Sequence, residues 1–243
     1  MKDLISYKGI EKAFGKKEVL EGIDLSVGKG ETLVILGGSG SGKSVLLKIT
    51  IGLMYPDAGR LLIDGEDATD YGEREWLEVR KKISYMFQWG ALFDSMNVYD
   101  NVAFPLREQR VDEAQIKERI SDALDTLGLE GTEAVFPHDL SGGMRKRVAL
   151  ARSIISKPEC ILYDEPTAGL DPVTSDQINS LIRKTQEKFH VTSVVVTHDI
   201  RSMAFVADKV AFLYEGRIAF SGTLEEAKKS VHPVLKEYLS GRV

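Results

Sequence analysis

The stretch "TLVILGGSGSGKS", residues 32–44, decides how the rest of the sequence is interpreted. It starts as a short apolar strand, continues as a loop that fits G-x-x-x-x-G-K-[ST], and leads into the helix-like "SVLLKITIGL" at residues 44–53. Glycines let consecutive backbone N–H groups curl around phosphate oxygens, and a helix N-terminus adds its positive dipole end. The stretch therefore predicts a phosphate-binding loop. The alternative, a glycine-rich turn with an incidental lysine, does not explain the strand before it and the helix after it.

The predicted phosphate loop has eight consecutive residues: Gly37, Gly38, Ser39, Gly40, Ser41, Gly42, Lys43 and Ser44. We expect Lys43 to reach the β- and γ-phosphates of a nucleotide, and the Ser44 hydroxyl to ligate Mg²⁺.

The segment "CILYDE", residues 160–165, complements this loop. Four apolar residues place Asp164 at the carboxyl end of a strand, which lies beside the phosphate loop in sheets of this type. We expect Asp164 to hold Mg²⁺ through its waters and Glu165 to act as general base for an attacking water. Two acids at a strand end could instead only solvate a loop, but their combination with Lys43 favours the catalytic interpretation.

Gln88 and His198 each follow another apolar run, "ISYMF" at residues 83–87 and "SVVVT" at residues 193–197. Gln88 could join the Mg²⁺ or water shell, and His198 could contact the γ-phosphate. A single glutamine is weak evidence and a single histidine is more often structural, so both hypotheses depend on position.

The apolar runs at residues 32–36, 83–87, 160–163 and 193–197 are nearly continuous, as expected of parallel strands that are covered on both faces. Helical patterns lie between them, which predicts an α/β core. Alternating segments predict antiparallel hairpins, one turning at residues 15–17 and one at Glu215-Gly216, and another strand ends at the Asp64-Gly65 turn. Residues 223–226 form a capping box that should open a helix.

Residues 92–155 read as mainly helical. Asp112 can cap a helix that Gly128 stops, and one face of that helix is lined by Ile116, Ile120, Ala123, Leu124 and Leu127. Because core strands resume afterwards, we interpret the chain as one domain, 1–243. In it, residues 1–91 and 156–243 form the core and residues 92–155 form an inserted helical subdomain.

Composition narrows the function classes. The 243 residues carry a net charge of −5 with 43% hydrophobic content, which suits a globular protein and gives no support to nucleic-acid binding. The single cysteine, Cys160, excludes an internal disulfide framework and fits a reducing compartment. No apolar run approaches the ~18 residues of a membrane span, so we expect any membrane role to come through a partner.

A second anion-binding helix end is predicted in "LSGGMRKRVALARSI", residues 140–154. Ser141, Gly142 and Gly143 directly precede the helical run, and small residues at a helix N-terminus can bind an anion. One nucleotide needs only one phosphate loop. We therefore hypothesise that the second helix end serves the nucleotide of another subunit.

Residues 37–44, Gln88, "LSGG", "CILYDEP", "AGLD" (residues 168–171) and His198, in this order, strongly resemble the nucleotide-binding subunit of ATP-binding cassette (ABC) transporters. The resemblance runs from Tyr7 to about Gly222. It implies the ABC ATPase fold, an α/β P-loop NTPase (RecA-like) core with an antiparallel β subdomain and an inserted α-helical subdomain.

The resemblance also implies a homodimer in the nucleotide-bound state. Two chains would face each other head to tail and hold two ATP molecules, each between one phosphate loop and the other chain's Ser141 and Gly143. Phe14 would stack on adenine, although a core phenylalanine is the alternative, and Asp171 would couple the two sites. Glu165 and His198 would align the attacking water.

The segment "FQWGALFDSMNVYDNVAFPL", residues 87–106, is unusually apolar for a loop. In this family it faces the cytoplasmic coupling helix of an integral membrane permease, which implies a partner contact through Trp89 to Phe104. Alternatively its side chains only pack the helical block. We expect a mixed role, with an interface before Asn97 and core after it, where Val98 and Val102 stand one helical turn apart.

The sequences of residues 90–108 and 164–175 resemble those of the ATPases of Mla-type, mammalian-cell-entry (MCE) phospholipid transporters. This implies an ATPase peripheral to the cytoplasmic face of the inner (plasma) membrane, which powers lipid transport with a permease and an MCE-type lipid-binding protein. One alternative is the ATPase of another ABC system, for lipoprotein release or amino-acid import. A soluble ABC ATPase acting on ribosomes or DNA is disfavoured, because such proteins usually carry two cassettes or a long coiled-coil insertion.

Overall fold

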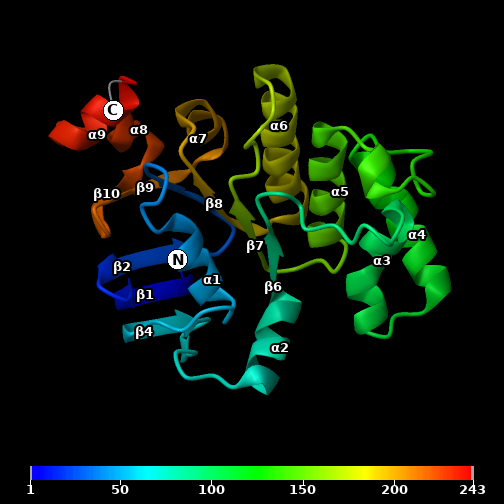
Figure 1. Ribbon diagram of the computed structural model, residues 1–243, viewed down its shortest axis with the longest axis horizontal. Coiled ribbons are helices and arrows are strands. Elements are labelled where there is room, and N and C mark those ends of the chain that lie inside the picture. Colours follow the sequence, from blue (N-terminus) through cyan, green and yellow to red (C-terminus); the bar gives the residue numbers. More distant parts are fainter. Residues whose placement is uncertain (1, 242–243) are drawn as a thin grey trace.

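The computed structural model describes residues 2–241. Its centre is a six-stranded sheet in the order β10-β9-β3-β8-β7-β6 (Figure 1). The strands are β3 (Thr32–Leu36), β6 (Ile83–Met86), β7 (Cys160–Asp164), β8 (Thr192–Thr197), β9 (Lys209–Tyr214) and β10 (Arg217–Thr223). The pairs β9–β3, β3–β8, β8–β7 and β7–β6 are parallel, and only β10 is antiparallel to its neighbour. The predicted, mostly parallel α/β sheet is confirmed.

Both faces of this sheet are buried, which explains the continuous apolar runs. In β3, Val34 and Leu36 join one hydrophobic cluster, whereas Leu33 and Ile35 join a second cluster. Alternate residues of β7 and β9 divide between the two clusters in the same way. Successive side chains of a strand point to opposite faces, so the sheet lies between two apolar layers.

The second sheet is antiparallel, in the order β2-β1-β4-β5. Its strands are β1 (Asp3–Phe14), β2 (Lys17–Gly28), β4 (Ala58–Ile63) and β5 (Glu66–Asp67). The turn between β4 and β5 is Asp64-Gly65, and both residues have positive φ angles, of 52° and 90°, as a tight hairpin of this kind requires. The predicted N-terminal hairpin is confirmed, and so are the Asp64-Gly65 turn and the hairpin that turns at Glu215-Gly216.

Helices cover both faces of the central sheet (Figure 1). They are α1 (Lys43–Thr50), α2 (Glu73–Lys82), α3 (Val98–Glu108), α4 (Glu113–Thr126), η1, a 3-10 turn (Pro137–Asp139), α5 (Gly142–Ile154), α6 (Pro172–Phe189), α7 (Ile200–Val206), α8 (Leu224–Lys228) and α9 (Pro233–Leu239). Helices α1 and α2 pack with the antiparallel sheet in one layer, whereas α3 to α9 contribute to the other. Within residues 2–241, no helix combines the length and the apolar character needed to cross a membrane.

Several boundaries differ from the sequence prediction. Strand β7 extends one residue further, to Asp164, and β8 begins one residue earlier, at Thr192. Strand β6 ends at Met86, one residue before the predicted end. Helix α1 ends at Thr50, because Gly52 lies in the left-handed region with φ 65° and a Cβ there would come within 2.2 Å of the Trp76 ring. The close approach of α2, which the sequence analysis did not predict, therefore sets the end of α1.

The stretch from residue 92 to residue 155 contains α3, α4 and α5, as its composition predicted. Asp112 caps α4 by accepting a hydrogen bond from the Ala114 N–H, and the five apolar residues predicted for one face of α4 and its end are all buried. That this stretch is a subdomain distinct from the core remains a prediction, as do its boundaries.

The apolar loop before α3 is organised by one buried side chain, that of Asn101. Its amide oxygen accepts from the Phe93 N–H at 2.8 Å. Its amide nitrogen donates to the carbonyls of Phe93, Met96 and Asn97 at 3.1, 2.9 and 3.0 Å. An amide with two donors and an acceptor can replace several strand-type backbone contacts at once. Residues 93–97 are thus held in place without regular secondary structure.

We expect Asn101→Ala to lower the free energy of unfolding by about 2–3 kcal/mol, because a buried N–H and several carbonyls lose their partner. Urea denaturation followed by circular dichroism would measure this change. Gln109→Ala, which alters an exposed amide at the end of the same helix, is the control and should change stability by less than about 0.5 kcal/mol. Equal effects of the two substitutions would contradict the role given to Asn101.

Candidate functional site

The predicted phosphate loop connects β3 to α1 and packs closely against the backbone of neighbouring strands. A Cβ at Gly37 would lie 2.5 Å from the Leu213 carbonyl oxygen. Gly42 has φ 103°, and a Cβ there would lie 2.9 Å from the carbonyl oxygen of Val19. Neither position has room for a side chain, so packing requires glycine at both. At Gly42 the backbone conformation requires glycine as well.

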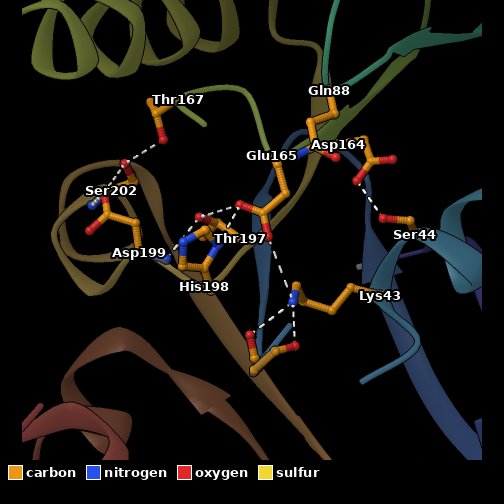
Figure 2. A network of polar contacts seen from close by, with 12 residues as sticks. Lys43, Ser44, Gln88, Asp164, Glu165, Thr167, Thr197, His198, Asp199 and Ser202 are labelled. Atoms are coloured by element: carbon orange, nitrogen blue, oxygen red, sulfur yellow. Dashed lines mark hydrogen bonds and ion pairs between the residues drawn. The ribbon is translucent and has the colours of Figure 1, made fainter. Parts of the chain in front are cut away.

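Lys43 is buried inside the curve of this loop. Its ammonium group donates to the carbonyls of Gly37 and Gly38 at 2.8 and 2.9 Å, and it lies 3.6 Å from Glu165 Oε1 (Figure 2). Burial lowers the pKa of Lys43, and the nearby Glu165 carboxylate opposes that shift. The cation is thus held at the centre of the loop by oxygen atoms of two different segments.

Asp164 lies at the end of β7, and both of its carboxylate oxygens accept hydrogen bonds. Oδ1 accepts from the Ser44 hydroxyl at 2.7 Å and Oδ2 accepts from the Tyr85 hydroxyl at 2.8 Å. Burial raises the pKa of Tyr85, and the Asp164 charge raises it further, so the phenol stays a donor. Figure 2 shows Gln88 next to this group.

Glu165 and His198 form the second part of the site. The Nδ1 atom of His198 lies 3.0 Å from each carboxylate oxygen of Glu165 (Figure 2). Glu165 is 9% exposed and has a φ of 47°, which a non-glycine residue rarely adopts. Backbone strain of this kind is concentrated at functional sites. The carboxylate is therefore placed beside the imidazole by a backbone conformation that the surrounding packing has to maintain.

These residues line one cleft of about 510 Å³. Its lining comprises Phe14, Lys17, Val19, Ser39, Gly40, Gly42, Lys43, Ser44, Val45, Gln88, Glu165 and His198. Phe14 is 47% exposed at the edge of this cleft, so the alternative of a core phenylalanine is wrong. The structure thus brings the predicted phosphate loop, Gln88, Glu165, His198 and Phe14 together.

The second predicted anion site does not line this cleft. Ser141 caps α5 and is exposed, with its hydroxyl accepting from the Met144 N–H at 3.2 Å. Asp171 caps α6 by accepting from the Val173 and Thr174 N–H groups, both at 3.0 Å. A Cβ at Gly143 would lie 2.6 Å from the Thr174 Cγ2 atom, so the two helix ends are in close contact. Residues 141–143 and 171–174 form one surface of the molecule.

The sequence prediction did not include Tyr85, Thr197 and Lys146, which contact groups of the site. It also did not include three residues that line the cleft, Lys17, Val19 and Val45. Thr197 donates to Glu165 at 3.4 Å. Lys146, on α5, donates to the carbonyl oxygens of Gln88 and Glu165, the latter at 3.1 Å, and its burial lowers its pKa to about 8. The one available signal for Lys146 was helical spacing, because it lies three and four residues from the buried Ala149 and Leu150.

The family described as "ABC transporter" matches this sequence over residues 20–168. The chain belongs to the ABC transporter family. It is 38% identical to the "Intermembrane phospholipid transport system ATP-binding protein MlaF" of Haemophilus influenzae, over 98% of this chain and 91% of that protein. It is 41% identical to the "Probable ribonucleotide transport ATP-binding protein mkl" of Mycobacterium leprae, over 98% of this chain and 69% of that protein.

A solved structure of the ATP-binding cassette MJ0796, a dimer in a post-hydrolysis state bound to ADP and Pi, resembles this chain with a TM-score of 0.83. Its sequence is 32% identical, and the match covers 90% of this chain and 98% of that one. The fold is therefore the ABC ATPase fold. The chain is an ATP-binding subunit that hydrolyses ATP to drive transport.

We expect Lys43→Ala to weaken ATP binding by roughly 10- to 100-fold, because the substitution removes a charge-assisted hydrogen bond to phosphate. Titration with a fluorescent ATP analogue would measure the affinity. Lys48→Ala removes a lysine from the same helix but outside the cleft, and should leave the affinity unchanged. An unaltered affinity in Lys43→Ala would show that the loop is not the phosphate site.

Proposed function

We propose that two copies of this ATPase bind two ATP molecules at their interface. Each phosphate group would lie in the cleft formed by residues 37–44, with Lys43 at the β- and γ-phosphates and Phe14 against the adenine ring. The exposed end of α5, with Ser141, Gly142 and Gly143, would complete the site of the opposite copy, with Asp171 beside it. The separation of this surface from the chain's own cleft supports the arrangement, and so does the dimeric state of the related cassette MJ0796.

Ser44, Gln88 and Asp164 would hold Mg²⁺. Their hydroxyl, amide and carboxylate oxygens are hard ligands, and Mg²⁺ in nucleotide sites uses few protein ligands together with waters and phosphate oxygens. Within residues 2–241 there is no cluster of three or more acidic, histidine or cysteine side chains that would form a cage made of protein alone. When bound, the ion would neutralise charge on the β- and γ-phosphates.

Glu165 and His198 would together promote the hydrolysis of ATP. Glu165 would accept a proton from a water molecule whose oxygen attacks the γ-phosphorus, while the bond to the ADP oxygen breaks in line with the attack. His198, 3.0 Å from the carboxylate, would fix its orientation and contact the γ-phosphate. Lys43 would stabilise the negative charge of the transferred group.

Glu165→Gln should retain ATP affinity but lower kcat by at least about 100-fold, since the amide cannot take the proton. It should also accumulate an ATP-bound dimer, which size-exclusion chromatography with light scattering would detect. The control is Glu187→Gln, a change at an acid of α6 that pairs with Arg183 outside the cleft. Normal turnover in Glu165→Gln would mean that another group is the base.

We further propose that the transported substrate is a phospholipid or related lipid moved between membranes. The observation that carries this proposal is the similarity to MlaF, which extends over nearly the whole of both chains. The ATPase would lie at the cytoplasmic face of the inner membrane as a peripheral subunit, together with an integral membrane permease and an MCE-type lipid-binding protein.

The surface offered to the permease would be the loop before α3 and the groove beside it. Trp89 is 74% exposed and Phe93 is 41% exposed, whereas Val98 and Val102 are fully buried, as expected for an interface followed by core. A groove of about 490 Å³ runs along this loop and is lined by Leu53, Tyr85, Phe87, Phe93, Phe104 and Pro105 among others. An apolar groove of this kind suits one amphipathic helix of a partner.

Ribonucleotide transport is the competing proposal, supported by the name of the mycobacterial relative, which is 41% identical to this chain. Lipoprotein release and amino-acid import also share the same ATP chemistry. These alternatives differ in the partner and the substrate rather than in this chain.

Co-purification from detergent-solubilised membranes of the native organism tests the substrate. We expect a tagged chain to recover a permease, an MCE-type protein and bound phospholipid, identified by mass spectrometry. ATP-dependent loss of labelled phospholipid from vesicles reconstituted with that complex would support lipid transport, with Glu165→Gln as the inactive control. Recovery of an importer with a bound ribonucleotide or amino acid, and no lipid, would contradict it.

A further inference from the structure

Lys146 is a buried cation that the proposed ATPase mechanism does not use. It lies in the first half of α5 and is 4% exposed. A lysine ammonium has three donors and no acceptor, so it needs oxygen atoms around it when buried. Within the part of the chain that the structure describes, its hydrogen-bond partners are two backbone carbonyls and no carboxylate.

Those two carbonyls belong to Gln88 and Glu165. Gln88 follows β6 and Glu165 follows β7, and these two strands are parallel neighbours in the central sheet. One side chain therefore joins the two strand ends that carry a proposed Mg²⁺ ligand and the proposed general base. The contact is made to the backbone, so it leaves both functional side chains free to act in the cleft.

The same helix holds the Gln88 segment at a second point. Arg152 donates to the carbonyls of Gly90 and Ala91 at 2.6 and 2.9 Å. These two residues have positive φ angles, of 80° and 46°. For Ala91 this left-handed backbone conformation is sterically unfavourable, because the residue has a Cβ atom. A loop in this conformation depends on outside contacts, and α5 supplies them on both sides of Trp89.

The buried ammonium group of Lys146 has lost its hydration, which is unfavourable for folding unless its contacts with the protein serve a purpose. Moving an ammonium group out of water is unfavourable, and apolar residues that replace buried charges are often neutral or stabilising. Ala149 and Leu150, three and four residues after Lys146 in α5, are buried in the hydrophobic core, so Lys146 stands beside apolar packing. The two carbonyl oxygens, of Gln88 and Glu165, are the contacts that account for a lysine at this position.

We propose that Lys146 is a positioning residue for ATP hydrolysis, which fixes the backbone of Gln88 and Glu165 from α5. The helix whose exposed end would meet the nucleotide of the opposite copy thus also sets the geometry of the chain's own site. This inference rests on the roles given above to Gln88 and Glu165.

The test is the basal MgATP hydrolysis of the purified full chain. Lys146→Met, which keeps the length of the side chain but removes the donors, should lower kcat by at least about 10-fold, because small displacements of catalytic groups are costly. The KM for ATP should change by less than about twofold. The Tm should fall by no more than a few degrees, because the desolvation cost of the ammonium group is removed together with its two hydrogen bonds. Lys146→Arg, which keeps charge and donors, should recover most of the lost kcat.

The matched control is Arg147→Met. It removes the neighbouring cation of α5, which donates to Gln177 and not to the strand ends, and kcat should stay within about twofold of the unchanged protein. Amide hydrogen exchange should become faster in residues 88–93 of Lys146→Met but not of Arg147→Met. Should Lys146→Met not fold, Lys146→Gln gives the same measurement with a neutral donor that is shorter, and kcat should again fall at constant KM.

A kcat within twofold of the unchanged protein in Lys146→Met or Lys146→Gln would overturn the inference. So would a loss of activity that follows a loss of Tm and is equal in the two α5 variants. Because no lipid or membrane partner enters the assay, a failed lipid proposal does not affect the result. If Glu165→Gln kept its turnover, the assignment of the base and this inference would both fail; if only the Lys146 variants kept theirs, this inference alone would fail.

Discussion

The site depends on the parallel arrangement of four strands, which brings their carboxyl ends to one edge of the sheet. β3 leads to Lys43, β6 to Gln88, β7 to Asp164 and Glu165, and β8 to His198. Parallel strands must be covered on both faces, and here each face is covered by its own hydrophobic cluster. The geometry that collects the polar residues is therefore maintained by apolar side chains that point away from them. A register shift in any of these strands would move a catalytic group and expose part of the core at the same time.

The sequence was sufficient to predict this edge because each strand, and the polar residue that ends it, is a local pattern. The phosphate loop, Gln88, the acidic pair and His198 all follow continuous apolar runs, and the end of a run is easy to recognise. Contacts between segments that are far apart in the sequence were not predictable in this way. Tyr85 lies within a run, and Lys146 stands in a helix where charged residues ordinarily face solvent. Only the packing of α5 against the ends of β6 and β7 gives Lys146 its partners. The early end of α1 has the same explanation, since it depends on the packing of Trp76 from α2 against Gly52.

The apolar loop between β6 and α3 shows how a protein can expose aromatic residues on an ordered surface. Its backbone is fixed by Asn101 from α3 and by Arg152 from α5. Both side chains donate to carbonyl groups of the loop, and Asn101 also accepts from the Phe93 N–H. The backbone therefore does not depend on the exposed faces of the Trp89 and Phe93 rings, which remain accessible to a partner. An exposed aromatic group on a fixed backbone loses little conformational entropy when it is covered, which is the condition for a strong contact with a partner. These properties suit the loop to the partner contact proposed for it.

The absence of space at Gly143 has a mechanical consequence. Since the end of α5 touches Thr174 without any intervening side chain, a push on residues 141–143 acts directly on the first turn of α6. Helix α6 has 18 residues, so it is roughly 27 Å long, and near its far end Gln186 donates to the Gly30 carbonyl just before β3. A stiff rod therefore runs from the face that would meet a second copy to the base of the strand that carries the phosphate loop. A second copy that docked on residues 141–143 would therefore meet a continuous helix whose far end is hydrogen-bonded to the residues before the phosphate-loop strand.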